Sequence, residues 1–94
     1  MSVLEKIRQG IRDRDYYLSS HAEEEMAEDR FEREDLEYAI LHGSVEKKMT
    51  HDPRGTRYRI AGPAVDGRSM HVICRHRRIG GPIIVTVYGE EEQP

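Results

Sequence analysis

Basic and hydroxyl-bearing side chains alternate with apolar ones along the second half of the sequence. Arg57 and Arg59 are two residues apart, so they share one face if this segment is a strand. The same alternation in the two later apolar segments completes a face that displays Arg57, Arg59, His71, Arg75, Thr86 and Tyr88. Guanidinium groups match phosphate oxygens, and a tyrosine can stack on a base or donate a proton. The pattern predicts a phosphate-binding face; the alternative is the ordinary solvated face of a half-buried antiparallel sheet.

One histidine stands at a predicted helix start. Ser20 and Glu23 have capping-box spacing, which places His21 as the first residue of that helix. The positive end of the helix dipole disfavours the charged imidazolium, and a neutral ring is what a general base requires. The alternative is a histidine that only packs against or caps the helix.

Metal-binding patterns are weak in this sequence. His21 and Glu25 are four residues apart on one helical face, but two ligands do not make a site. On a strand, His71 faces away from Cys74 and His76, so the three cannot share one ion without a bulge. We therefore expect no metal and no cofactor, and we expect Cys74 to be a small core residue.

Three amphipathic segments make up the first half of the chain. Apolar residues recur at helical spacing, which predicts helices over residues 2–12, 21–29 and 33–42. Between the first two lies a short β-prone run, residues 16–19. Gly43 is expected to end the third helix in the left-handed conformation.

After Gly43 the apolar period changes from helical to alternating. Strands are predicted over residues 45–50, 56–61, 68–76 and 83–88, joined by turns that contain glycine and proline. Alternation assigns Met70, Val72 and Cys74, together with Ile83, Val85 and Val87, to the apolar face and Ile84 to the opposite face. The expected fold is α+β, with the N-terminal helices packed on one face of a four-stranded antiparallel sheet.

Length and composition limit the class of protein. The 94 residues are enough for one domain, which we assign to residues 1–89, followed by an acidic tail, residues 90–94, expected to be disordered. Charged residues make up 35% of the chain, and its longest apolar run is far too short to span a bilayer. The N-terminus lacks the apolar segment of a signal peptide, so a cytoplasmic protein is expected.

The charge is divided unevenly along the chain. Residues 1–43 hold 6 Lys/Arg and 12 Asp/Glu, a net charge of −6, whereas residues 44–89 hold 9 Lys/Arg and 3 Asp/Glu, a net charge of +6. A basic half suggests a phosphate-rich partner or an acidic protein partner. The alternative is that the two halves attract each other within the fold.

Several short motifs resemble a small bacterial domain family of unknown function. They are Ser20-His21-Ala22, Gly43, Arg57, Gly67-Arg68 and Thr86-Val87-Tyr88. That family looks allied to the RelE-like and BrnT-like toxins, whose architecture is shared with barnase-type and colicin-type ribonucleases. The resemblance covers roughly residues 15–89 and implies a RelE/barnase-like fold and metal-independent cleavage of RNA.

The resemblance also implies roles for individual residues. His21 looks like the catalytic residue that a helix contributes, and Arg57 looks like the basic residue of a strand. Thr86 and Tyr88 look like the pair of residues that the last strand contributes. The shared face adds His71 to the catalytic group, and Arg59, Arg68 and Arg75 are expected to bind RNA. In this hypothesis His21 or His71 removes the proton of a ribose 2′-hydroxyl, the arginines stabilise the phosphate, and Tyr88 or the second histidine protonates the leaving oxygen.

The rival hypothesis is a non-catalytic module that uses the same face. It would bind RNA without cleavage, or an acidic protein such as an antitoxin-like helix. The chain is net acidic, with a charge of −3, unlike the strongly basic RelE-type enzymes that it resembles. The sequence leaves the oligomeric state open.

Overall fold

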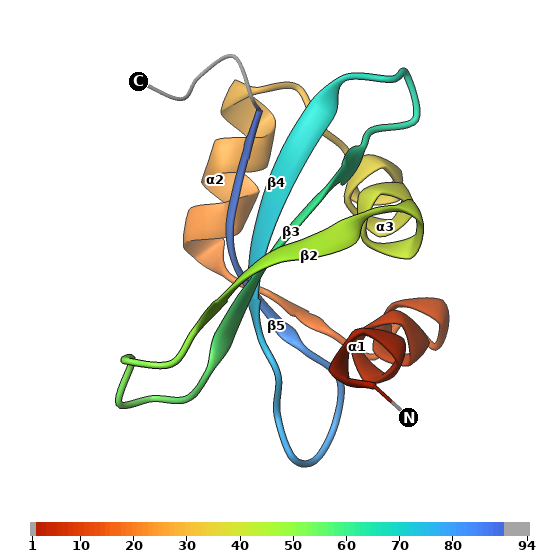
Figure 1. Cartoon of the computed structure of the whole chain (residues 1–94). Coiled ribbons are helices and arrows are strands. Elements are labelled where there is room, and N and C mark those ends of the chain that lie inside the picture. Colours follow the sequence, from red (N-terminus) through yellow and green to blue (C-terminus); the bar gives the residue numbers. More distant parts are fainter. Residues whose placement is uncertain (1, 90–94) are drawn as a thin grey trace.

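The computed structural model describes residues 2–89, so the expected acidic tail, residues 90–94, lies outside the described residues. Within this range three helices and five strands follow one another in the order α1 (Val3–Arg12), β1 (Tyr17–Leu18), α2 (Ser20–Glu28), α3 (Arg33–His42), β2 (Ser44–Met49), β3 (Arg57–Pro63), β4 (Ser69–Arg75) and β5 (Ile83–Gly89) (Figure 1). The α+β class predicted from the change of period is confirmed. No helix in the described part of the chain is long and apolar enough to cross a membrane.

The sheet has five strands in the order β1-β5-β4-β3-β2. The expected four-stranded antiparallel sheet is therefore wrong in one respect, because β1 adds a parallel strand at the edge of β5. The N–H of Tyr17 donates to the carbonyl of Pro82, and that of Ser19 donates to the carbonyl of Ile84. These bonds join segments far apart in the sequence, which is why the short β-prone run alone did not reveal its partner.

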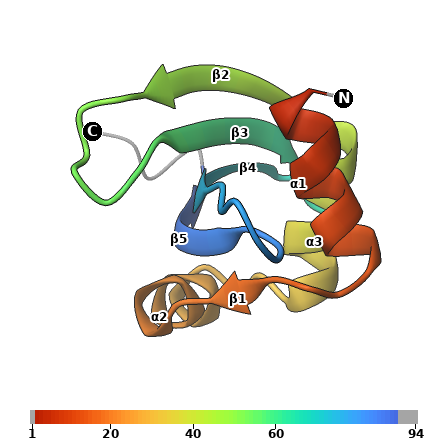
Figure 2. The same cartoon turned by 90° about the horizontal axis from the view of Figure 1, so that it is seen from below.

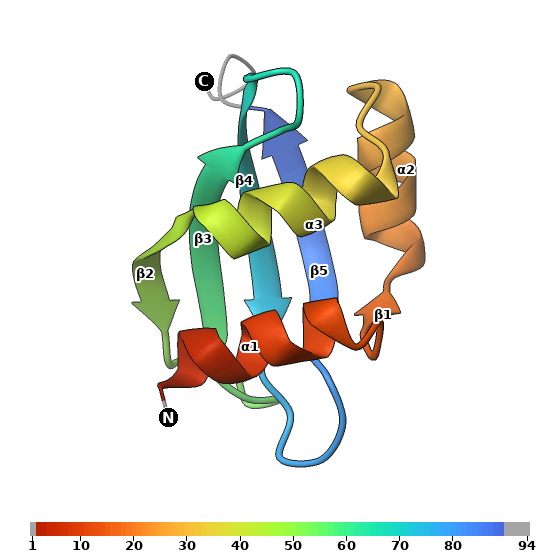
Figure 3. The same cartoon turned by 90° about the vertical axis from the view of Figure 1, so that its right-hand side faces the viewer.

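The helices occupy two different places around the sheet. Figures 2 and 3 show α1 and α3 crossing one face of the strands. Helix α2 instead continues from β1 along the β5 edge of the sheet. Carboxylates of α2 and of its C-cap accept hydrogen bonds from the β5 edge: Glu25 accepts from the N–H of Val87 (3.1 Å) and the C-cap Asp29 from that of Gly89 (3.2 Å). The core between α1, α3 and the sheet contains Ile7, Leu36, Ile40, Ile60, Met70, Val72, Cys74, Ile84 and Val87. We call the face of the sheet opposite α1 and α3 the open face.

The start of α2 differs from the predicted one by one residue. The N-cap is Ser19, whose hydroxyl oxygen accepts from the N–H of Ala22 and donates to the carbonyl of Val85. Helix α2 therefore begins at Ser20, and His21 is its second residue. Ser19 serves as the cap because β1 ends immediately before it, and its hydroxyl then satisfies both the helix and the sheet edge.

Gly43 ends α3, but not in the left-handed conformation that was expected. Its backbone is extended, with φ −91° and ψ −169°, and leads directly into β2. A side chain at this position would collide with the carbonyl oxygens of Ala39 and Ala61. Glycine is therefore required here for close approach of α3 to β3, and not for its φ angle.

A β-bulge in β5 changes the predicted faces of that strand. Ile73 of β4 pairs with Thr86, but its neighbour Cys74 pairs with Ile84, so Val85 is an extra residue. Ile84 consequently points into the core, with no exposed surface, while Ile83 pairs with Arg75 on the open face. The predicted assignment of Ile83 and Ile84 is thus wrong, because one extra residue inverts the alternation.

Candidate functional site

The open face brings together most of the predicted site residues. The pairing of β3, β4 and β5 arranges them in three rows across the strands, because directly paired residues share a face. These rows are Arg57–Arg75–Ile83, Arg59–Ile73–Thr86 and Ala61–His71–Tyr88. Six of the eight predicted residues therefore lie on one continuous surface.

The third row, which contains His71 and Tyr88, lies next to a carboxylate that the sequence did not indicate, that of Glu46. Glu46 lies at a register shift in β2, between Val45 and Lys47, which turns its side chain onto the open face. Its Oε1 is 3.3 Å from Nδ1 of His71 and 3.2 Å from Nε of Arg59. The His71 ring stacks on Tyr88 with centroids 4.9 Å apart and an interplanar angle of 11°. We call Glu46, Arg59, His71 and Tyr88 the Glu46 cluster.

His71 is the buried member of this cluster. Its side chain is only 6% exposed, whereas that of Glu46 is 39% exposed. The carboxylate is thus open to a ligand, while the imidazole behind it is held by the Tyr88 ring. Such a pair can accept and pass on a proton.

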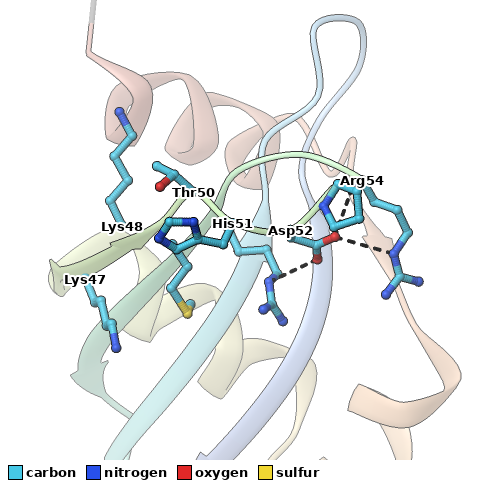
Figure 4. A pocket seen from close by; sticks show the side chains of 9 residues that line it. Lys47, Lys48, Thr50, His51, Asp52 and Arg54 are labelled. Atoms are coloured by element: carbon cyan, nitrogen blue, oxygen red, sulfur yellow. Dashed lines mark hydrogen bonds and ion pairs between the residues drawn. The ribbon is translucent and has the colours of Figure 1, made fainter.

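A second carboxylate organises the first row. Oδ2 of Asp52 accepts from Nη2 of Arg75 at 2.8 Å and lies 3.3 Å from Nε of Arg57. Figure 4 shows Arg54 beside the same carboxylate, with its Nε 3.6 Å from Oδ1. The N–H of Arg54 donates to Oδ1 at 2.9 Å. This backbone hydrogen bond, followed by the bond and charge of Arg75, lowers the pKa of Asp52. Asp52 therefore carries a negative charge among three guanidinium groups.

Four buried nitrogen atoms of the open face lack a well-aligned hydrogen bond to any of the described residues. Nε of Arg57, Arg59 and Arg75 and Nδ1 of His71 are buried and have no hydrogen bond within residues 2–89. Nε of Arg57 and Nε of Arg59 are close enough to their carboxylates for ion pairing, but the angles do not suit hydrogen bonds. Nδ1 of His71 likewise lies 3.3 Å from the Glu46 carboxylate, so a ligand with better-aligned acceptors would complete hydrogen bonds that these carboxylates leave unmade.

His21 lies at the β5 edge of the sheet, outside the Glu46 cluster. Its side chain is 66% exposed, and Nε2 is 3.3 Å from Oε1 of Glu25, the same oxygen that accepts from Val87. The imidazole is thereby fixed beside the strand that carries Thr86 and Tyr88. It shares an edge with the open face, but the structure gives it no contact with the arginines.

Arg68 is separated from the other predicted RNA-binding residues. Its guanidinium donates to the carbonyls of Asp29 (2.7 Å) and Arg30 (2.9 Å) and to the carboxylate of Asp66 (2.8 Å), and it lies 4.3 Å from the centroid of the Phe31 ring. These contacts tie the β3–β4 turn to the end of α2. Its placement therefore gives its predicted role in RNA binding no support.

The structure also limits the roles of the remaining reactive groups. Cys74 is fully buried, and this burial raises the pKa of its thiol to about 12, so it is a core residue as expected. No group of three or more histidine, cysteine, aspartate and glutamate side chains among residues 2–89 is arranged to hold a metal ion.

Glu46 and Asp52 were missed for different reasons. Glu46 and Lys48 are two residues apart, so strict alternation along the strand assigns them to the same face. Only the register shift in β2 places them on opposite faces. Asp52 stands in an Asp-Pro-Arg-Gly turn, where an aspartate is common without any further role.

Comparison with known proteins identifies the family. A family model described as "Domain of unknown function (DUF4258)" matches residues 18–89, from β1 to the end of β5. No curated protein and no solved structure matches the chain. Because the match covers most of the chain and all of the open face, this protein belongs to the DUF4258 family of domains of unknown function.

Proposed function

We propose that this domain is a metal-independent endoribonuclease of RelE-like architecture that cleaves RNA by attack of the 2′-hydroxyl. The observation that supports this most is the gathering of Arg57, Arg59, Arg75 and His71 on one face, where buried N–H donors lack well-aligned hydrogen bonds within the described part of the chain, beside the accessible carboxylate of Glu46. A phosphodiester would supply acceptors for these donors, and its reaction needs a proton acceptor close by.

The Glu46 cluster can perform each proton transfer of the reaction. The Glu46–His71 pair takes the proton of the 2′-hydroxyl, and the resulting oxygen attacks the adjacent phosphorus. Arg59, with Arg57 or Arg75, stabilises the charge that develops on the phosphate oxygens. The bond to the 5′-oxygen breaks, and Tyr88 donates a proton to this leaving oxygen, with exposed His21 as the second candidate donor. The products are a 2′,3′-cyclic phosphate and a 5′-hydroxyl, and DNA is not cleaved because it lacks the 2′-hydroxyl.

The test is cleavage of single-stranded RNA by the purified protein in excess EDTA. Tyr88→Phe keeps the ring that stacks on His71 and removes only the hydroxyl, so we expect the cleavage rate to fall by about 100-fold. Arg57→Ala and His21→Ala test the phosphate contact and the second proton donor. His42→Ala and Arg12→Ala, two exposed residues on the helical side, should leave the rate unchanged.

Two results would contradict the ribonuclease proposal. One is no cleavage by the native protein, and the other is cleavage that survives unchanged in Tyr88→Phe and Arg57→Ala. Thermal unfolding of every variant separates loss of the reaction from loss of the fold. Expression provides an independent readout, because an active ribonuclease should arrest growth of the host.

A second function is favoured by the way the arginines are already held. Asp52 pairs with Arg57 and Arg75, and Glu46 pairs with Arg59, so the arginines of this face already bind carboxylates. The same surface would then bind an acidic protein segment, or RNA without cleavage. Binding of an acidic peptide by a protein that cleaves no RNA would favour this alternative.

A further inference from the structure

A basic concavity adjoins the open face beneath the turn between β2 and β3. It has a volume of about 740 Å³ and is lined by residues 47–54 and by Arg57 (Figure 4). Four lysine and arginine side chains line it against one aspartate, which leaves a net charge of +3 without His51. A hollow of this size suits a ligand as large as a nucleotide, and its charge suits an anion.

The strand register shows which side chains extend the open face. Lys47 pairs with Arg59, and Met49 pairs with Arg57, so both point to the open face. Lys48 pairs with Tyr58, a core residue, and therefore points to the other face. Figure 4 shows Lys47 and Lys48 leaving β2 in opposite directions. The Glu46 cluster and the concavity are thus two parts of one surface.

Arg57 connects the two parts. It lines the concavity, it belongs to the first row of the open face, and its buried Nε lacks a hydrogen bond within residues 2–89. Arg54, whose side chain is 81% exposed, stands on the other side of Asp52. Arg54 and Arg57 flank Asp52, and Lys47 lies at the opposite side of the concavity (Figure 4), so successive phosphates of one strand would meet three cations against a single carboxylate of the lining.

The concavity also offers surfaces for a base. His51 can stack on a base, and Met49 and Pro53 add apolar surface to the lining. We propose that this concavity is a second nucleotide-binding subsite, which holds the phosphate and base of a nucleotide that follows the one at the Glu46 cluster in single-stranded RNA. The identity of the ligand as RNA rests on the proposed function.

Binding can be measured without cleavage by using a labelled 2′-O-methyl RNA of about 10 nucleotides. Fluorescence anisotropy would compare the native protein with the Lys47→Gln/Arg54→Gln variant. We expect the affinity of this variant to fall by roughly 10-fold and the slope of log affinity against log salt to decrease by about 1.4, since each phosphate contact to a single strand contributes about 0.7. The matched control is Lys6→Gln/Arg12→Gln, which removes the same charge from two exposed residues of α1 and should bind like the native protein.

An equal loss of affinity in both double variants would overturn the subsite, because net charge alone would then explain binding. Unchanged binding in Lys47→Gln/Arg54→Gln would also overturn it. The two proposals fail separately. If the 2′-O-methyl RNA binds through Lys47 and Arg54 but unmodified RNA is never cleaved, only the ribonuclease proposal is overturned. Conversely, if RNA is cleaved but its binding does not depend on Lys47 and Arg54, only the subsite proposal is overturned.

Discussion

Asp52 gathers the arginines of the open face, and its charge depends on pH. The pKa of Asp52 lies below its ordinary value of 3.8 because the Arg54 N–H and the Arg75 guanidinium stabilise the carboxylate. A carboxyl whose folded pKa is lowered contributes stability that is fully present above its unfolded pKa and is lost as pH falls through the folded pKa. We therefore expect Asp52→Asn to reduce the free energy of unfolding near about pH 7, with a much smaller reduction near about pH 2, where the carboxyl becomes protonated in the folded protein as well.

Urea unfolding of native and variant protein at the two pH values measures this effect. Glu24→Gln is the matched control, because it removes a carboxylate from an exposed residue of α2. If Asp52→Asn lowers the free energy of unfolding by the same amount at both pH values, the charge of Asp52 does not hold the three arginines.

The contact of α3 with β3 depends on two glycines that face each other. A side chain on Gly62 would collide with the carbonyl oxygen of Ala39 and come within 3.0 Å of Cα of Gly43. Both obstacles are backbone atoms, which cannot turn aside as a side chain would. We expect Gly62→Ala to lower the free energy of unfolding by about 2 kcal/mol or more, because the helix must move away from the sheet.

Gly89→Ala is the control at the element scale. A side chain there would meet the Phe31 ring at 3.7 Å, an ordinary van der Waals distance. Chemical denaturation of the two variants should therefore give a large loss for Gly62→Ala and a small one for Gly89→Ala. Similar losses of the free energy of unfolding in the two variants would mean that packing of α3 on β3 does not depend on close approach of their backbones.

Across the whole molecule, the acidic and basic halves do not pair. Every ion pair among residues 2–89 joins two side chains of the same half, such as Arg59 with Glu46 or Arg8 with Glu5. The acidic half instead uses carboxylates on backbone N–H groups, as Asp35 does with Val65 and Glu25 with Val87. The idea that the halves are held together by ion pairs therefore finds no support.

Salt is expected to affect binding of RNA much more than folding. Between about 50 mM and about 200 mM salt, affinity for the 2′-O-methyl RNA should fall about 10-fold or more, because phosphate contacts displace counterions. The urea midpoint should change much less over the same range, because the shortest of the Asp52 ion pairs, with Arg75, is largely buried and therefore little screened by salt. A falling midpoint together with salt-independent binding would reverse this conclusion.

Local patterns in the sequence predicted a large part of this structure. The helix predicted over residues 33–42 is α3, and the predicted faces of Arg57 and Arg59 against Tyr58 and Ile60 are those observed. These features were predictable because the burial period of a helix or strand is repeated within a few residues of the chain.

The rest was decided by contacts between distant segments. The parallel pairing of β1 with β5, the extra residue Val85 and the turning of Glu46 toward His71 each depend on register with another strand. Sequence alone determined which residue types alternate and therefore that a basic face exists. Only the tertiary structure determined which carboxylates enter that face, because a shift of one residue in pairing moves a side chain from one side of a sheet to the other.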